Sequence, residues 1–172
     1  WDTLPLYMHV RKATAFNKKE LKFLSKYPLT CLEKTMGMQT YGSSEEGSIQ
    51  AAKAIKLINP RTKILYYRNV LVHYPFYESD KQLKSIAQPF LKNKQGQGKL
   101  VRKTNEAYDL TNKQLRDWWV DNVKKVLSDP AIDGLFLDGN IKALEPQYLK
   151  EDLSAKKKKQ SMKDYHLLMQ ET

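Results

Sequence analysis

Residues 112–139, NKQLRDWWVDNVKKVLSDPAIDGLFLDG, decide the fold class of this chain. Their first part, Asn112–Leu127, places apolar side chains along one broad face and predicts an amphipathic helix. Asp129-Pro130 ends that helix, because proline cannot continue it. The apolar run Leu135–Leu137 then predicts a short buried strand, which Asp138 closes. The stretch therefore predicts one helix followed by one buried strand.

Three further short apolar runs precede this stretch. They predict strands at Leu4–Val10, Leu29–Glu33 and Lys63–Tyr67. Capping residues followed by apolar spacing predict helices at Asn17–Tyr27 and Ser43–Ile58. Strands this short and this uniformly apolar are typical of a parallel sheet that is buried on both faces. We therefore expect an α/β fold of parallel β/α units, with the four strands neighbouring one another in sequence order.

Two polar segments lie outside this alternation. Residues 71–106 are long for a loop, and we expect a short helix within Ser79–Ala87. Residues 145–172 are rich in charge and are predicted to form one or two helices. They contain the dense lysine run Lys156–Lys159.

The composition limits the class of protein. The chain has 172 residues, of which 41% are hydrophobic, so it can form a core and is not a disordered chain. Cys31 is the single cysteine, which excludes an internal disulfide. No apolar run approaches the roughly 18 residues that span a bilayer, and no signal segment opens the chain. Because the first residue is Trp1, we expect a processed chain or a fragment. A secreted location stays open, and no compartment is assigned.

The net charge is +11, from 30 Lys and Arg against 19 Asp and Glu. Such an excess permits binding to a polyanion. Outside Lys156–Lys159, however, the lysines are spread along predicted helices, where a solvated face explains them. No phosphate-binding loop, zinc-finger spacing or RNA-binding motif accompanies the charge.

Polar side chains end the predicted strands, at the edge where parallel β/α folds hold their active sites. His9 closes the first strand, Glu33 the second and Asp138 the fourth, and Arg68-Asn69 follows the third. Burying an unpaired carboxylate costs free energy, which favours a functional role for these groups. Asp138 is the strongest candidate, because an apolar strand leads directly to it and Gly139 leaves space beside it.

Each of these residues also has a structural explanation. His9 could be a hydrogen-bonded histidine of the core. Glu33 could form a surface ion pair with Lys34, and Arg68 could balance Glu33.

Aromatic residues beside carboxylates suit sugars, whose apolar ring faces pack on aromatic rings. Asp138 and Glu33 are therefore the candidate carboxylates of such a site. Candidate substrate-binding residues are the polar and aromatic groups at the strand ends: His9, Arg68, Asn69, Tyr67 and Asn140. No cofactor motif is present. His9, Glu33 and Asp138 could coordinate a divalent ion, but no spacing such as HExxH supports a metal site.

Three runs resemble glycoside hydrolases that fold as a (β/α)8 barrel: YDLTN at 108–112, RDWW at 116–119 and DGLFLDG at 133–139. Looser similarity to their second and third β/α units is found around Leu32–Lys34, Ala51–Pro60 and Lys63–Tyr67. The resemblance spans about Trp1 to Gly139. It implies a barrel enzyme that cleaves O-glycosidic bonds with two carboxyl groups. In several similar barrel glycosidases the nucleophile ends the fourth strand, which is the position of Asp138.

The resemblance also shows a difference in length. A full barrel takes about 250 residues, so we expect residues 1–144 to form the N-terminal half of a barrel, continued by a charged helical segment in residues 145–172. The second catalytic carboxyl would be Glu33 or would lie in the missing strands. A half barrel leaves sheet edges and apolar side chains uncovered, so we expect poor activity of the chain alone and self-association.

Two other functions stay open. A non-catalytic relative could use the same groups only to bind an oligo- or polysaccharide. A basic module could instead bind nucleic acid, which steep salt dependence of binding would indicate. Neither a membrane nor a cofactor is expected as a partner.

Overall fold

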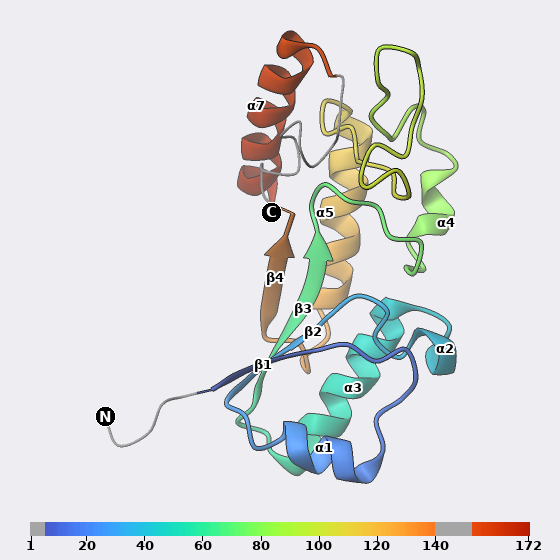
Figure 1. Ribbon diagram of the computed structural model, residues 1–172. Helices are drawn as coiled ribbons and strands as arrows, with labels where there is room; N and C mark the ends of the chain where they lie inside the picture. Colours follow the sequence, from blue (N-terminus) through green and yellow to red (C-terminus); the bar gives the residue numbers. More distant parts are fainter. Residues whose placement is uncertain (1–5, 140–152) are drawn as a thin grey trace. The chain divides into compact units, whose positions relative to one another are not determined.

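The computed structural model describes residues 6–139 and 153–172 (Figure 1). Its strands are β1 (Tyr7–Val10), β2 (Leu29–Leu32), β3 (Lys63–Asn69) and β4 (Gly134–Asp138). They form one parallel sheet in the order β1-β2-β3-β4. This order confirms the predicted α/β fold of parallel β/α units, and it is the arrangement of part of a TIM-type barrel.

The helices agree with the prediction in position. The described helices are α1 (Lys18–Leu24), α2 (Met38–Tyr41), α3 (Ser44–Ile58), α4 (Asp80–Leu83), α5 (Lys113–Leu127) and α7 (Ala155–Glu171). The single turn α2 was not expected from the sequence. It begins and ends at glycines whose φ angles are 60° and 85°, which limits it to four residues.

Side chains cap the first turns of two helices. Asn17 Oδ1 accepts the N–H of Glu20 at 3.0 Å, and Glu20 Oε2 accepts the N–H of Asn17 at 2.8 Å, so α1 begins with a capping box. Ser43 Oγ accepts the N–H of Glu46 at the start of α3. These bonds satisfy backbone donors that have no partner within the helix.

The chain divides into two compact units. Unit 1 contains Trp1–Arg68, Phe76–Glu78 and Val123–Phe136. Unit 2 contains the remaining segments, Asn69–Pro75, Ser79–Asn122 and Leu137–Thr172. The unit boundaries therefore pass through β3 and β4, close to the carboxyl end of each strand.

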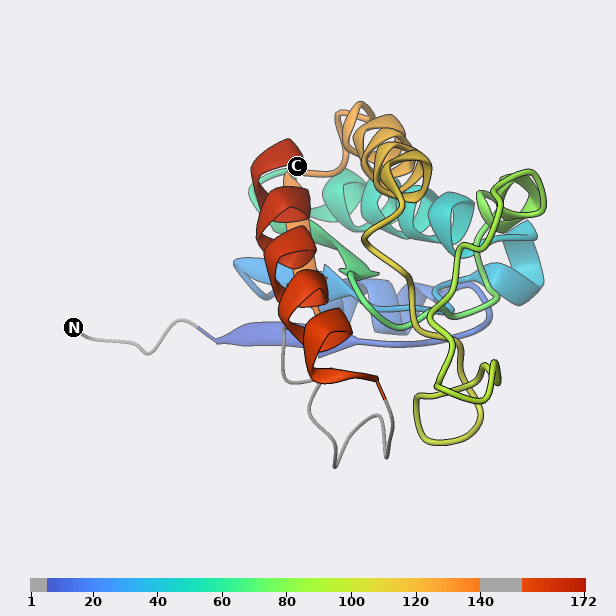
Figure 2. The same cartoon turned by 90° about the horizontal axis from the view of Figure 1, so that it is seen from above.

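In unit 1, α1 and α3 pack against each other (Figure 2). Side chains alternate along a strand, so Met8 and Val10 share one face of β1, and Tyr7 and His9 share the other. The core of the unit is apolar and almost fully buried, with Leu24, Leu32, Ala52, Ile55 and Ile64 among its members.

Asp133, in the turn before β4, binds the start of β3. Its Oδ2 accepts the N–H of Ile64 at 2.8 Å and lies 2.6 Å from Lys56 Nζ, while Oδ1 lies 3.0 Å from Lys63 Nζ. Burial alone would raise the pKa of Asp133, but the hydrogen bonds from Lys56, Ile64 and Lys63 outweigh burial and lower that pKa. Asp133 lies in a turn, as its Asp-Gly sequence indicates, and it also binds the first residues of β3.

We expect Asp133→Asn to lower the stability of the chain at neutral pH. A carboxyl whose pKa is lower in the folded state stabilises the fold above its unfolded pKa of about 3.9, and this contribution is lost as the pH falls through the folded pKa. The urea midpoint of the wild type should therefore fall more steeply than that of the variant between about pH 5 and about pH 3. Asp117→Asn, on an exposed turn of α5, is the control. Equal pH dependence of Asp133→Asn and the wild type would contradict the prediction.

In unit 2, the long segment between β3 and α5 is ordered by isolated strand pairings. Val72 pairs with Ala107, and Phe90 pairs with Tyr108. The Tyr108 ring lies 5.9 Å from the Phe90 and Trp118 rings, and Trp118 Nε1 donates to the Ser79 carbonyl at 3.1 Å. The short helix expected within Ser79–Ala87 is α4. The segment is therefore a folded part of unit 2 that packs on α5.

Candidate active site

Asp138 is the last residue of β4, and its side chain is exposed. Its carbonyl accepts the N–H of Val70 at 2.9 Å, which fixes the backbone of the strand end. Both carboxylate oxygens also accept hydrogen bonds, Oδ2 from the Asn69 amide at 3.3 Å and Oδ1 from the Gly139 N–H at 2.6 Å. These two hydrogen bonds orient the carboxylate at the end of the strand.

Asn69 orients Asp138 from a buried position at the end of β3. Its Oδ1 accepts the N–H groups of Leu71 at 3.0 Å and Val72 at 2.6 Å, so its Nδ2 is the group that faces Asp138. Its carbonyl accepts the indole N–H of Trp119 at 3.1 Å. Asn69 thus binds the Asp138 carboxylate and is itself bound by a buried tryptophan of α5.

Gly139 is required beside this pair. Its φ is +77°, a left-handed conformation that favours glycine, and a Cβ there would lie 2.3 Å from Asn69 Oδ1. Any larger residue would displace the Asn69 amide that holds Asp138.

A second group of candidate residues forms an aromatic cluster in unit 1. The His9 ring packs edge-on against Phe136 with centroids 5.0 Å apart, and Tyr67 stacks on Phe136 with centroids 6.1 Å apart. His9 Nδ1 hydrogen-bonds the Tyr7 hydroxyl at 2.9 Å. Burial raises the pKa of Tyr7, and Cys31 adds to this rise. The cluster presents an exposed imidazole on a partly buried aromatic base.

Glu33 follows β2 and lies among cations at the edge of this cluster. Its carboxylate forms an ion pair with Lys34, and its Oε2 lies 3.8 Å from Arg11 Nε. Lys34 Nζ also lies 4.9 Å from the centroid of the buried Tyr67 ring. The ion pair with Lys34 that the sequence suggested is therefore present, and Lys34 covers one face of Tyr67.

Arg68 is almost fully buried and packs on an aromatic ring. Its guanidinium carbon lies 3.7 Å from the centroid of the Tyr77 ring. Alternation along β3 places Arg68 on the face of Tyr66, opposite to Tyr67. Burial raises the pKa of Tyr66 well above its usual value, although the charge of Arg68 acts against this rise. The structure thus gives Arg68 a place in the core of unit 1.

The candidate residues are divided between the two units. Asn69 and Asp138 contact each other in unit 2, while His9, Glu33 and Tyr67 belong to unit 1. Their convergence on one site stays a prediction.

Sequence reasoning missed three contributions to these clusters. Phe136 could have been found, because it lies two residues before a candidate and so shares its strand face. The position of Lys34 over an aromatic ring and the hydrogen bond from Trp119 depend on packing, for which the sequence has no signal. Asn140, a candidate substrate-binding residue, lies outside the described residues.

Within residues 6–139 and 153–172, no three His, Cys, Asp or Glu side chains are grouped to hold a metal ion. In the same part of the chain, no helix is both long enough and apolar enough to cross a membrane.

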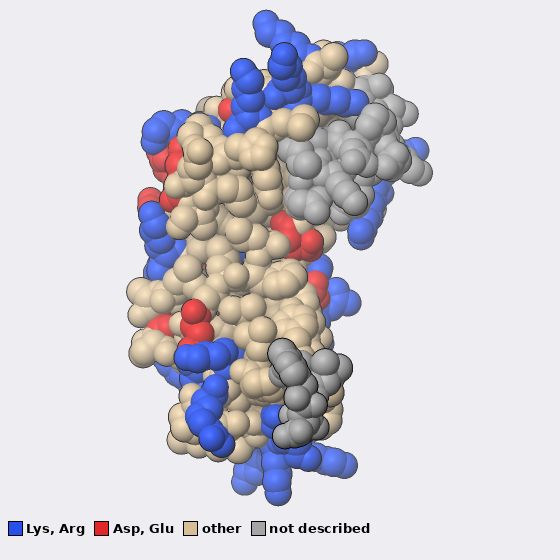
Figure 3. Space-filling view, turned by 90° about the vertical axis from the view of Figure 1, so that its left-hand side faces the viewer, with Lys and Arg blue, Asp and Glu red and all other residues tan. Residues whose placement is uncertain are grey.

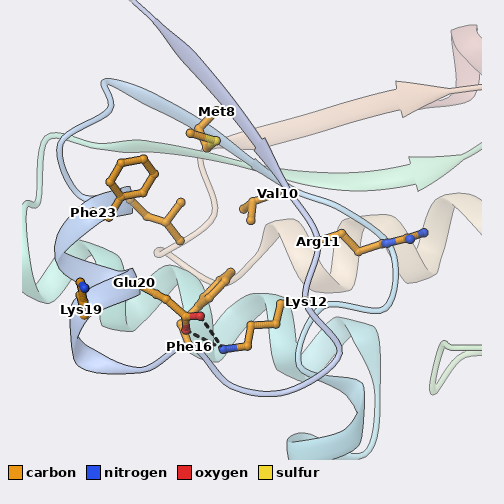
Figure 4. Close-up of a pocket in the computed structure, with 9 residues that line it drawn as sticks. Met8, Val10, Arg11, Lys12, Phe16, Lys19, Glu20 and Phe23 are labelled. Atoms are coloured by element: carbon orange, nitrogen blue, oxygen red, sulfur yellow. Dashed lines mark hydrogen bonds and ion pairs between the residues drawn. The ribbon is translucent and has the colours of Figure 1, made fainter.

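A cavity of about 430 Å³ lies between β1 and α1 in unit 1 (Figure 4). Its wall is mostly apolar, with Met8 and Val10 contributed by β1 and Phe23 by α1. The ion pair of Lys12 with Glu20 borders it at 2.6 Å. Because Met8 and Val10 occupy the strand face opposite to His9, the cavity is separate from the aromatic cluster.

The model of hypothetical glycosyl hydrolase family 15 matches residues 56–172, more than half of the chain. The chain belongs to this family. The matched region includes Asn69 and Asp138, whereas His9 and Glu33 precede it. A search of curated proteins found no match.

Several solved structures similar to this member of hypothetical glycosyl hydrolase family 15 are glycoside hydrolases. The α-galactosidase AgaA of Geobacillus stearothermophilus, in complex with raffinose, aligns with a TM-score of 0.66 and 12% identity over 99% of this chain and 26% of its own. The α-galactosidase of Lactobacillus brevis aligns at 0.61 and 10% identity, over 96% of this chain and 24% of its own. A noncanonic maltogenic α-amylase, AmyB of Thermotoga neapolitana, aligns at 0.51 and 14% identity, over 94% and 43%.

These identities are low, so the likeness shows the fold. The chain spans about a quarter of the length of the α-galactosidases that it matches. The resemblance to barrel glycoside hydrolases that the sequence predicted is thereby confirmed at the level of family and fold.

Proposed function

We propose that this chain carries the nucleophile of a retaining O-glycoside hydrolase, and that the nucleophile is Asp138. The observation that carries the proposal is the exposed carboxylate at the end of β4, whose two oxygens are held by Asn69 and Gly139. Membership of a glycosyl hydrolase family supports the reaction class. The position also suits the chemistry, because loops meet at the carboxyl ends of parallel strands.

In this proposal, a carboxylate oxygen of Asp138 forms a bond to the anomeric carbon while the bond to the departing sugar oxygen breaks. A second carboxyl group donates a proton to that oxygen, and later takes a proton from the water that hydrolyses the glycosyl ester. Glu33 is our candidate for the second group. A carboxyl outside the 172 residues is the alternative. Retention requires the two carboxyl groups to lie about 5 to 5.5 Å apart.

The aromatic cluster of unit 1 is the proposed substrate contact. His9 is exposed and can donate to or accept from a sugar hydroxyl, while Phe136 and Tyr67 support its ring. Asn69 would act through Asp138. We propose oligo- or polysaccharides as substrates, the class to which the raffinose bound by AgaA belongs.

Trapping with 2-deoxy-2-fluoro glycosyl fluorides tests the assignment on the whole chain. We expect mass spectrometry to find one added glycosyl group on the peptide that contains Asp138, and none in Asp138→Asn. Label on another carboxylate would contradict the choice of nucleophile. Binding of glycans without label or turnover would favour a non-catalytic carbohydrate-binding relative.

A further inference from the structure

Basic residues of unit 2 are concentrated in two segments. Residues 81–103, between β3 and α5, contain seven Lys and Arg and no Asp or Glu. The helix α7 begins with Lys156–Lys159. Each segment belongs to the connection that follows the carboxyl end of a strand, β3 for the first and β4 for the second. The chain thus places both segments in the loops of the catalytic end, where β4 ends in Asp138.

Contacts within unit 2 connect the two segments. Lys157 Nζ lies 2.8 Å from the Asp109 carboxylate and 2.8 Å from Thr111 Oγ1. The N–H of Asp109 in turn donates to the carbonyl of Pro89 at 2.9 Å. The first turn of α7 therefore lies against the strand pairing from which the basic loop extends. Figure 3 shows Lys and Arg side chains gathered at the upper end of the view, over the start of α7.

The tip of the basic loop has a defined backbone. The N–H of Val101 donates to the carbonyl of Asn105, and the reverse bond is also formed, both at 3.0 Å. Leu100 and Val101 are buried, which anchors the tip. Arg102 and Lys103 have φ angles of 54° and 60°, in the left-handed region that side chains other than glycine rarely adopt. The backbone that carries these two exposed cations is therefore fixed by the Val101–Asn105 pairing and by the buried Leu100 and Val101.

Six lysines of this surface lack an ion pair within residues 6–139 and 153–172. We call the following lysines the basic rim, and none of them forms an ion pair with any described residue: Lys94, Lys99, Lys103, Lys156, Lys158 and Lys159. Lysines in a first helical turn also oppose the helix dipole, whereas α3 begins with Glu45 and Glu46, which match it. Stability of the fold therefore explains Lys157, which binds Asp109, but not Lys156, Lys158 and Lys159.

We propose that the basic rim binds the anionic groups of an acidic polysaccharide, so that the substrate class of the site at Asp138 is an anionic glycan. The inference rests on the proposed function. Residues 91–106 and 155–161 contain no aromatic side chain, and stacking on aromatic rings is what single-stranded nucleic acid needs. They contain instead amides such as that of Gln97, whose Oε1 accepts from Asn93 Nδ2 and whose Nε2 can donate to a sugar hydroxyl.

Binding of oligogalacturonate to the whole chain tests the rim, and the same oligosaccharide with its carboxylates methyl-esterified is the neutral control. We expect the ester to bind about tenfold more weakly, and affinity for the acid to fall with salt. A sulfated carrageenan oligosaccharide distinguishes sulfate from carboxylate as the preferred anion. Equal binding of the acid and the ester would overturn the inference, as would tighter binding of a DNA duplex or strand than of either anionic glycan.

Charge reversal locates the surface. Lys103→Glu/Lys159→Glu should weaken oligogalacturonate binding about tenfold, whereas Lys18→Glu/Lys22→Glu, with the same change of net charge on α1 of unit 1, should change it less than about twofold. Equal losses in the two variants would overturn the assignment to the rim.

Asp138→Asn separates this inference from the proposed function. In the Asp138→Asn background, Lys103→Glu/Lys159→Glu should still weaken oligogalacturonate binding about tenfold, because the rim does not include Asp138. Rim-dependent binding by a chain that takes up no label from 2-deoxy-2-fluoro glycosyl fluorides would refute the enzyme while supporting the rim. The opposite outcome is also possible to observe. If the chain hydrolyses neutral and acidic glycosides equally well, and Lys103→Glu/Lys159→Glu does not change this turnover, the rim is refuted and the enzyme is supported.

Discussion

Asp138→Asn should lower kcat for glycoside hydrolysis by about 10⁴-fold or more, because an amide cannot form the glycosyl ester. The variant should fold normally. The Asp138 side chain is exposed, and its contact with β3 through Val70 uses the backbone carbonyl, which the substitution leaves in place. Steady-state hydrolysis of aryl glycosides and urea denaturation measure the two effects. Asp121→Asn, at an exposed position of α5, is the matched control and should keep full activity.

Azide rescue identifies the role of Asp138. In Asp138→Ala a small anion can enter the space of the carboxylate and attack the anomeric carbon, so added azide should restore turnover and yield a glycosyl azide. With Glu33→Ala, added azide should not yield a glycosyl azide of the same anomeric configuration. Normal turnover by Asp138→Asn would show that Asp138 is not the nucleophile.

Trp119→Ala should destabilise the chain by about 3–5 kcal/mol, the range found when a buried large aromatic side chain is removed. Trp119 is fully buried in α5, and its indole N–H donates to the carbonyl of Asn69. The truncation leaves a cavity and removes the hydrogen bond to the Asn69 carbonyl. Urea denaturation measures the loss, and a decrease below about 1 kcal/mol would contradict the packing described above.

Trp119→Phe and Trp118→Phe form a matched pair that tests the link to the site. Each removes one buried indole N–H, from the Asn69 carbonyl in the first case and from the Ser79 carbonyl in the second. Each should cost about 1–3 kcal/mol of stability. Trp119→Phe should also lower kcat, because Asn69 positions Asp138, whereas Trp118→Phe should leave kcat unchanged. Equal kcat in the two variants would remove Trp119 from the support of the site.

Much of the fold could be predicted from local sequence. Asn17 and Glu20 predicted the start of α1, since a capping box needs only residues three apart. Asp129-Pro130 and the apolar run before Asp138 predicted the end of α5 and the position of β4. Repetition of such units was enough to predict a parallel sheet in sequence order, because parallel strands need a long connection between them.

The environment of each candidate residue could not be predicted in this way. The substrate-binding role of Asn69 stays a prediction, but the hydrogen bonds of its amide with two backbone N–H groups and Asp138 had no signal in the sequence. The same holds for Arg68, whose guanidinium packs on Tyr77. In both cases the fold brings the contacting residue near, and no local pattern in the sequence indicates which residue it is.

The sequence by itself determined the order of strands and helices in this chain and the placement of a carboxylate at the end of the fourth strand. These features follow from capping, chain breaks and apolar periodicity, which act over a few residues. The tertiary structure alone decided that Trp119 holds Asn69, that Asn69 holds Asp138, and that Gly139 must lack a side chain. Residues 70 and 138, for example, meet only because β3 and β4 lie side by side. Such contacts depend on distances between segments far apart in the chain, which only the packed fold sets.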